Sequence, residues 1–431
     1  MTHPLPPMVT ERLGALRERP VEPVEKGFGS LRSQVSSADL AAAKPALREA
    51  GVGYPLLTLR DSALAGNLAA MAAWSAEAGV ALAPHGKTAM SPELAARQLA
   101  HGAWGITVAS IGQLQTYRAF GFPRLMLANE LVDEAGIAWL AAELAADPGF
   151  EAYCYVDSAD GVAILDRCLR RHPAGRRLPV LVEIGYAHGR TGCRSDGQAL
   201  DVAKAAQATG TLAVAGVAGY EGTLAGGEDE VAAFCRRLRA LAPVIYTALD
   251  EAAVRAGPPI VTAGGSAYFD VVARELTAGE DGAVQVILRS GAYLTHDHGF
   301  YGAVSPAGRG VPGAPALRPA LELWAQVLSR PEPGLALLGA GRRDVGFDKG
   351  LPVPLRVAGR APEPECDTAG WQVTELNDQH AYLRMDADAA LGPGDLVVLG
   401  ISHPCTTLDR WRALVVLDDD DHVIDIVHLF F

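Results

Sequence analysis

Short apolar runs alternate with longer helix-like stretches through the middle of this chain. Strands that read as continuous apolar runs are typical of parallel sheets covered on both faces, and a repeated strand–helix pattern is typical of an α/β barrel. We therefore predict a TIM-type (β/α)8 barrel. The eight strands are expected at residues 80–83, 105–108, 124–128, 151–156, 178–184, 212–218, 259–263 and 283–288, separated by helices such as 110–120, 133–146, 158–171 and 198–209.

The pattern changes after about residue 300. Glycine and proline become dense from residue 305 to residue 319, and short β-like runs separated by turn residues follow. This pattern predicts a second, all-β domain. We expect three parts: an N-terminal arm (1–50), the barrel (51–300) and the C-terminal β domain (301–431). The expected strands of the last part are 321–328, 335–338, 371–376, 381–384, 396–399, 413–417 and 423–429.

Composition narrows the class of protein. The 431 residues carry a formal net charge of −13, which argues against nucleic acid or an anionic membrane as partner, because both need a basic face. We find no signal-peptide pattern and no apolar run of about 18 residues. The six cysteines are irregularly spaced and form no CxxC pair, so we expect reduced thiols in a cytoplasmic protein.

The first candidate for chemistry is the stretch Ala81 to Thr88, where an apolar run ends in Pro-His-Gly-Lys. Ser91 and Pro92 are suited to begin a helix directly after it. A strand that ends before a helix presents its last side chains at the C-terminal mouth of a barrel, where such folds keep their active sites. Lys87 is either a solvated surface lysine or, partly desolvated beside His85, an amine suited to Schiff-base chemistry.

Other polar loops are expected at the same mouth. A Gly-rich loop with Arg190 follows strand 178–184, and Tyr220 follows strand 212–218. The Gly264-Gly265-Ser266 turn after the next strand is either an ordinary loop or a cradle of N–H groups for a phosphate. A phosphate cradle, a Schiff-base lysine and an arginine together suggest pyridoxal 5′-phosphate (PLP) as cofactor.

The predicted β domain holds a further pair, His403 and Cys405. On an extended segment two such side chains project to the same side, and imidazole with thiolate is a zinc-type donor pair. The spacing is either accidental or a metal site. Two protein ligands leave coordination positions open for water or substrate.

Together these segments resemble the D-threonine aldolase / D-serine dehydratase family of fold-type III PLP enzymes, particularly its bacterial D-serine-deaminase-like members. The resemblance covers most of the chain, and the order of its motifs across both predicted domains makes it specific. The motifs are P-H-x-K-T (Pro84, His85, Lys87, Thr88), G-R-T-G (189–192), Tyr220 with Gly222, Gly264-Gly265-Ser266, R-S-G-x-Y-x-x-x-D (289–297) and H-x-C (His403, Cys405). Two departures from the family pattern are Ala83 and Ala89, which replace a flanking Arg and His.

The resemblance implies an alanine-racemase-like barrel with a C-terminal β domain, and a homodimer with its active site near the interface. It implies that Lys87 holds PLP as a Schiff base and is catalytic together with Tyr220. The implied cofactor-binding residues are Lys87, His85, Arg190, Tyr220, Gly264, Gly265, Ser266, Gly291 and Tyr293, and the implied ligands of a divalent metal are His403 and Cys405. Zn²⁺ is the expected metal, with Mn²⁺ and Mg²⁺ as alternatives.

We expect the reaction to be β-elimination from a D-3-hydroxy amino acid such as D-serine or D-threonine, giving a 2-oxo acid and ammonia. The first alternative is retro-aldol cleavage of the same substrates to glycine and an aldehyde. In the family a carboxylate at the second ligand position goes with aldolases and a cysteine with dehydratases, so Cys405 favours elimination. The second alternative is a non-catalytic PLP-binding protein, against which the second domain argues.

Overall fold

The computed structural model describes residues 2–31, 35–251, 254–255, 257–279, 284–358 and 368–431. The described chain divides into two compact units, and two of the boundaries between them fall inside helices α3 (Asp61–Glu77) and α4 (Pro92–Ala100). The first unit comprises Met1–Val9, Ala72–Lys87 and Gln98–Gly291, and the second comprises Thr10–Met71, Thr88–Arg97 and Ala292–Phe431.

The first unit is built on eight parallel strands in the order β4-β11-β10-β9-β8-β7-β6-β5. Backbone N–H groups of Trp104 and Thr107 donate to the carbonyls of Leu82 and Pro84, and a bridge joins His85 to Thr107, so the two end strands are also connected. The prediction of an alanine-racemase-like barrel is confirmed. The strands are β4 (Ala81–Leu82), β5 (Ile106–Val108), β6 (Arg124–Glu130), β7 (Glu151–Val156), β8 (Leu178–Ile184), β9 (Leu212–Gly219), β10 (Ile260–Ala263) and β11 (Gln285–Leu288).

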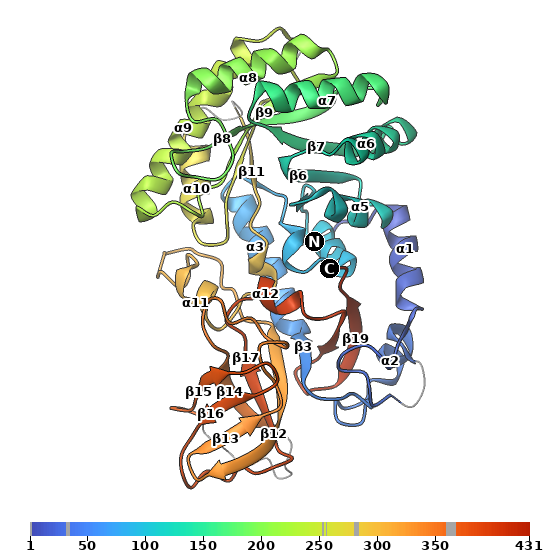
Figure 1. The fold of residues 1–431 in the computed structure, drawn as a ribbon, viewed down its shortest axis with the longest axis vertical. Coiled ribbons are helices and arrows are strands. Elements are labelled where there is room, and N and C mark those ends of the chain that lie inside the picture. Colours follow the sequence, from blue (N-terminus) through green and yellow to red (C-terminus); the bar gives the residue numbers. More distant parts are fainter. Residues whose placement is uncertain (1, 32–34, 252–253, 256, 280–283, 359–367) are drawn as a thin grey trace. The chain divides into compact units, whose positions relative to one another are not determined.

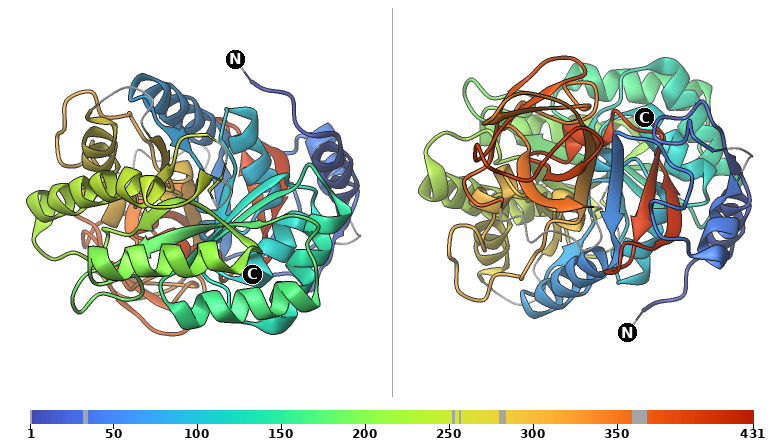
Figure 2. Two further views of the ribbon diagram at one scale, coloured as in Figure 1. Left: turned by 90° about the horizontal axis from the view of Figure 1, so that it is seen from above. Right: turned by 90° about the horizontal axis from the view of Figure 1, so that it is seen from below.

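The barrel helices lie outside these strands (Figures 1 and 2). They are α5 (Ile111–Ala119), α6 (Glu134–Ala146), α7 (Ala159–Arg171), α8 (Asp196–Thr209), α9 (Gly227–Thr247) and α10 (Phe269–Thr277). Four of them begin at a residue whose side-chain oxygen accepts a backbone N–H of the first turn, which satisfies one of the orphan donors there. These N-caps are Ser110, Asp133, Ser158 and Ser195.

The second unit contains a nine-stranded sheet, and β3 (Leu56–Arg60) is part of it. β3 pairs antiparallel with β12 and parallel with β18, and Figure 2 shows this blue strand beside the red strands. The boundary that we predicted at residue 50 therefore does not coincide with a division of the structure. The other strands are β12 (Leu321–Glu332), β13 (Leu335–Leu338), β14 (Val353–Ala358), β15 (Gln372–Leu376), β16 (Ala381–Arg384), β17 (Leu396–Gly400), β18 (Ala413–Leu417) and β19 (Val423–His428).

The remaining elements of the chain are short apart from the N-terminal helix. They are α1 (Pro7–Arg17), β1 (Pro20–Val21), β2 (Val35–Ser36), α2 (Ser37–Ala43), α11 (Phe300–Val304), α12 (Cys405–Leu408) and the 3₁₀ turns Gly86–Thr88 and Ala292–Leu294.

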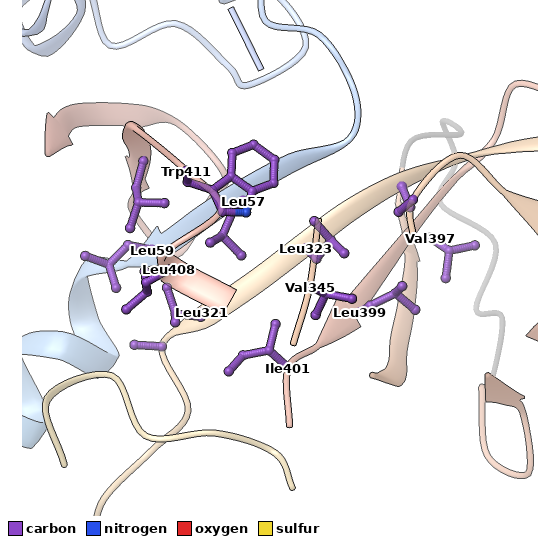
Figure 3. Close-up of a cluster of buried hydrophobic side chains, with 14 of the residues drawn as sticks. Leu57, Leu59, Leu321, Leu323, Val345, Val397, Leu399, Ile401, Leu408 and Trp411 are labelled. Carbon is purple, nitrogen blue, oxygen red and sulfur yellow. The ribbon is translucent and has the colours of Figure 1, made fainter. Parts of the chain in front are cut away.

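One hydrophobic cluster of the second unit contains buried residues of this sheet (Figure 3), and a second cluster contains their neighbours in the strands, among them Leu56, Trp324 and Val398. Leu57 and Leu59 of β3 pack with Leu321 and Leu323 of β12, all fully buried. Trp411 is also buried, and its indole N–H donates to the Asp344 carbonyl at 2.9 Å, so the one polar atom of that ring is satisfied. Burial of this apolar surface is the main stabilising contribution to the unit.

Two expectations about the whole chain were tested as far as the described residues reach. None of their helices is long and apolar enough to cross a membrane. Five of the six cysteines are free thiols there, and Cys366 lies outside the described residues.

Candidate active site

The predicted lysine stretch lies at the carboxyl end of β4. The chain leaves the strand at Pro84 and makes the 3₁₀ turn Gly86–Thr88, which the Tyr117 hydroxyl holds by donating to the Gly86 carbonyl at 2.9 Å. Helix α4 then begins at Pro92, and the Ser91 hydroxyl accepts the N–H of Leu94, as predicted. Lys87 as a whole residue is exposed.

His85 lies in an electropositive environment. Burial, and then the positive charges of Lys87, Arg289 and Arg190, lower the pKa of His85 well below its ordinary value, so the ring is neutral near pH 7. Its Nδ1 is buried and has no hydrogen-bond partner among the described residues. A Cβ at Gly291 would lie 2.5 Å from the His85 carbonyl oxygen, so only glycine permits this approach of the two loops.

The segments after β9 and β10 are connected by a residue that we did not predict. Glu221 is 1% exposed, and its carboxylate accepts the N–H groups of Gly264 and Gly265 at 3.1 and 2.5 Å. Gly264 adopts a φ of +102°, which favours glycine. The two backbone N–H groups that we predicted to bind the phosphate thus each donate to a carboxylate oxygen of Glu221, and Ser266 is the next residue of the turn.

Arg289 is a second residue whose place the sequence did not reveal. It is buried, and its guanidinium donates to the Thr262 hydroxyl at 2.7 Å and to the Gly219 carbonyl at 2.6 Å. It thereby connects β10 to the end of β9, where Tyr220 begins the next loop.

Arg190 and Tyr220 are in direct contact. The Arg190 guanidinium carbon lies 4.7 Å from the centroid of the Tyr220 ring, a cation–π arrangement. Burial and then Glu221 raise the pKa of Tyr220, although Arg190 and Arg289 oppose the increase, so the phenol is protonated near pH 7. Arg194 holds the loop that carries Arg190 by donating to the carbonyls of Thr191, Gly192 and Gly189 at 2.7–3.0 Å.

Tyr293 belongs to the second unit, where it is buried in the 3₁₀ turn Ala292–Leu294. Asp297 follows, and its carboxylate accepts the N–H groups of Gly299 and Tyr301 at 2.9 Å, which fixes the start of α11. Burial raises the pKa of Asp297 to about 6 against these bonds.

The predicted metal ligands also lie in the second unit, but not on an extended segment. Pro404 is helical, and Cys405 begins the short helix α12. His403 Nδ1 lies 2.9 Å from a carboxylate oxygen of Asp348, whose other oxygen accepts the Thr406 hydroxyl at 2.6 Å. Because a carboxylate only accepts, Nδ1 carries the proton toward Asp348, and the lone pair of the neutral ring lies on Nε2.

Cys405 and the rings around His403 complete this region of the second unit. The Cys405 thiol donates to the Thr88 hydroxyl at 3.4 Å, and Thr88 is the residue that follows Lys87 in the chain. The rings of Phe300 and Tyr301 on α11 lie 6.3 and 6.1 Å from the His403 ring.

Sequence reasoning missed Glu221, Asp348 and Arg194, and it left Arg289 without a role. A signal was present for two of them, since Arg289 directly follows predicted strand 283–288 and Glu221 lies three residues after predicted strand 212–218. Asp348 had no such signal, because it lies 55 residues before His403 in a segment between two strands.

Comparison with known proteins supports both parts of the fold. A model of the alanine racemase N-terminal domain matches residues 59–274, and a model of a putative serine dehydratase domain matches residues 320–417. D-threonine aldolase of Arthrobacter sp is 30% identical over 380 residues, which are 88% of this chain and 92% of that protein. 3-Hydroxy-D-aspartate aldolase of Paracoccus denitrificans (strain Pd 1222) is 26% identical over 72% of this chain and 77% of its own length. The crystal structure of D-threonine aldolase from Filomicrobium marinum superposes with a TM-score of 0.72 at 25% identity, covering 88% of this chain and 95% of that one.

Proposed function

Because this chain belongs to the D-threonine aldolase / D-serine dehydratase family of fold-type III PLP enzymes, we propose that it is a metal-dependent dehydratase of D-3-hydroxy amino acids. The substrate is of the D-serine or D-threonine type, and the products are a 2-oxo acid and ammonia. Two contacts carry the proposal. The Asp348 carboxylate is hydrogen-bonded to the ring of His403, and the thiol of Cys405, two residues later, donates to the hydroxyl of Thr88, the residue that follows Lys87.

The residues at the carboxyl ends of the barrel strands fit PLP. The cofactor is an anion, and Lys87, Arg190 and Arg289 make the surroundings of His85 positive in a chain of net charge −13. The buried Nδ1 of His85 supplies an orphaned polar atom, and Lys87 supplies the amine. When bound through Lys87, with Ser266 at its phosphate, PLP supplies an electron sink for the carbanion at Cα.

The donor set of the second unit fits a divalent ion. An imidazole and a thiol are suited to Zn²⁺ in preference to the harder Mg²⁺, and a carboxylate behind the histidine is the usual outer-shell partner of such a ligand. A metal held there supplies Lewis-acid stabilisation of negative charge on oxygen. Zn²⁺ is therefore the proposed metal.

The side chains of this protein have separate tasks in the elimination. The Lys87 amine, freed when the substrate amine replaces it, takes the proton from Cα. Because the His85 ring is neutral and Tyr220 is protonated, Arg190 and Arg289 supply the positive charge that attracts an anionic cofactor and substrate. His403 and Cys405 would hold the ion, which would supply stabilisation of negative charge on the β-oxygen. Hydrolysis of the released enamine gives the 2-oxo acid and ammonia.

Retro-aldol cleavage is the second candidate, and the similarity to D-threonine aldolase of Arthrobacter sp favours it. The two reactions share the substrate, and they differ in whether the Cβ–O or the Cα–Cβ bond breaks. The non-catalytic alternative has no support, since the relatives are lyases. Further parts of the proposal are a homodimer and a location in the cytoplasm.

D-Threonine distinguishes the two reactions. We expect the purified enzyme with PLP and Zn²⁺ to form 2-oxobutyrate and ammonia, measured by a coupled reduction of the oxo acid. Glycine and acetaldehyde as the main products would refute the dehydratase and establish the aldolase. L-Threonine serves as the control and is expected to give neither set of products.

Ser266→Ala is expected to raise the Kd for PLP by about tenfold or more while the turnover of PLP-saturated enzyme changes little. A phosphate ligand binds the cofactor equally throughout the cycle, so its loss affects binding more than the chemical step. Fluorescence titration of the apoenzyme measures the affinity, and Ser266→Thr, which retains a hydroxyl, is the matched control. A large loss of turnover at saturating PLP with unchanged affinity would contradict the phosphate role.

Asp348→Asn is expected to lower the affinity for Zn²⁺ by about 10- to 100-fold, the usual effect of removing an outer-shell carboxylate. Competition with a chromophoric chelator measures this affinity without reference to turnover. Asp378→Asn is the control, because Asp378 is an exposed carboxylate of the same unit that pairs with Arg343. Equal Zn²⁺ affinities for both variants would show that Asp348 does not orient a ligand.

A further inference from the structure

Three acidic side chains that the preceding sections did not consider lie together at the carboxyl ends of neighbouring barrel strands. Glu130 ends β6, Asp157 directly follows β7, and Glu183 lies near the end of β8. One carboxylate oxygen of each lies within 4.8 Å of the others. Within the part of the chain that the structure describes, this is the one group of three or more acidic, histidine or cysteine side chains spaced to hold a metal ion.

Two of the carboxylate oxygens have no hydrogen-bond partner among the described residues. Glu183 is 8% exposed, and its Oε2 and the Oε1 of Glu130 are buried with no partner among the described residues. Burial, and then Glu183 and Asp157, raise the pKa of Glu130 to about 8. Like charges this close in a desolvated site require either a proton or a bound cation.

A fourth oxygen, which is not part of the acidic group, points to a cation rather than a proton alone. Tyr155 is 2% exposed, and its hydroxyl is also buried without a hydrogen-bond partner among the described residues. It lies two residues before Asp157 on the same face of β7 and pairs in register with Glu130, in the interior of the barrel. Burial raises the pKa of its phenol, and Glu183 and Glu130 add to the effect against Arg289, so the hydroxyl lies within electrostatic reach of both carboxylates.

We propose that Glu130, Asp157 and Glu183, with the Tyr155 hydroxyl beside them, bind one hard divalent cation of the Mg²⁺, Mn²⁺ or Ca²⁺ class. Only oxygen donors are present, and such ions prefer carboxylate and neutral oxygen ligands. This cation site is distinct from the His403–Cys405 site, whose nitrogen and sulfur donors select softer metals. The proposal of this cation site holds whether the enzyme breaks the Cβ–O bond or the Cα–Cβ bond of the substrate.

The cation site is connected to the loop that carries Arg190. Asp157 accepts the Gly192 N–H on a carboxylate oxygen at 3.0 Å, and its backbone carbonyl accepts the Cys193 thiol at 3.3 Å. The Cys193 N–H donates to the Glu183 carbonyl at 2.7 Å. A cation that fixes Asp157 and Glu183 therefore fixes the base of the loop from which Arg190 reaches the Tyr220 ring.

Mn²⁺ binding to the PLP-loaded full chain tests the proposal, with electron paramagnetic resonance counting free and bound ion. The variant H403A/C405A removes the other metal site, and we expect it to retain one bound Mn²⁺ per chain. Adding Glu183→Gln should weaken that binding at least tenfold. Adding Glu151→Gln instead should leave the Mn²⁺ affinity unchanged, because the Glu151 carboxylate lies at the opposite end of β7.

Absence of bound Mn²⁺ in the folded H403A/C405A variant would overturn the proposal. A proton shared by the carboxyl groups would then be what offsets their mutual repulsion. Retention of full affinity after Glu183→Gln, or equal loss after Glu151→Gln, would overturn it as well. Circular dichroism verifies folding. If Glu183→Gln does not fold, Asp157→Asn gives the same comparison, with at least tenfold weaker binding supporting the site and unchanged binding refuting it.

Discussion

Lys87→Ala is expected to abolish the covalent attachment of PLP and to reduce turnover by several orders of magnitude. Loss of the general base alone accounts for about 10²–10⁴-fold in rate, and loss of the Schiff-base anchor adds to this. The absorbance of the lysine-bound cofactor should disappear. Borohydride reduction followed by peptide mass spectrometry should find PLP on Lys87 in the natural protein and on no peptide of the variant.

Lys204→Ala is the matched control, since Lys204 lies on α8, away from the carboxyl ends of the strands, and should retain both absorbance and activity. A Lys87→Ala protein that still carried reducible, covalently attached PLP would show that another lysine holds the cofactor. Such a result would remove the residue on which the proposed reaction depends.

Removal of the metal is expected to separate two steps of the reaction. Chelation should leave the PLP spectrum and the exchange of the substrate α-hydrogen with solvent largely intact, because in the proposed reaction Lys87, and not the metal, performs that proton transfer. Loss of the β-hydroxyl should fall by about 10³-fold or more, since a Lewis acid of this kind contributes several kcal/mol to stabilising the departing charge. Exchange followed by NMR in D₂O, and oxo-acid formation, measure the two steps in one sample.

His403→Ala and Cys405→Ala should each reproduce the effect of chelation, and the double variant should be little worse than either, because two ligands of one ion act as a unit.

Cys405→Asp should shift the metal preference from Zn²⁺ toward Mn²⁺ or Mg²⁺ and raise the share of aldol products. Full dehydratase activity in thoroughly chelated enzyme would refute the metal role.

Much of the barrel could be read from the order of residues. All eight strands that we predicted exist, because a strand covered on both faces must be apolar along its length, and the loops that follow carry N-caps such as Ser110 and Ser158. The runs of the C-terminal sheet were found in the same way. The exception was β14, whose run Val-Pro-Leu-Arg-Val-Ala is broken by a proline and an arginine. Lys87 was predictable too, because its place after an apolar strand and before a capped helix is a local property.

The partners of these elements were decided only in three dimensions. The apolar residues of β3 predict a strand, but not that it joins β12 and β18, since β pairing is set by packing between segments far apart in the chain. The same limit applies to side chains. Glu221 meets Gly264 and Gly265 across 43 and 44 residues, and Asp348 meets His403 across 55. Glu130, Asp157 and Glu183 come together because the barrel brings three strand ends to one rim. Sequence therefore determined which segments form strands, because that depends on local apolar runs, and the tertiary structure determined which charges face one another.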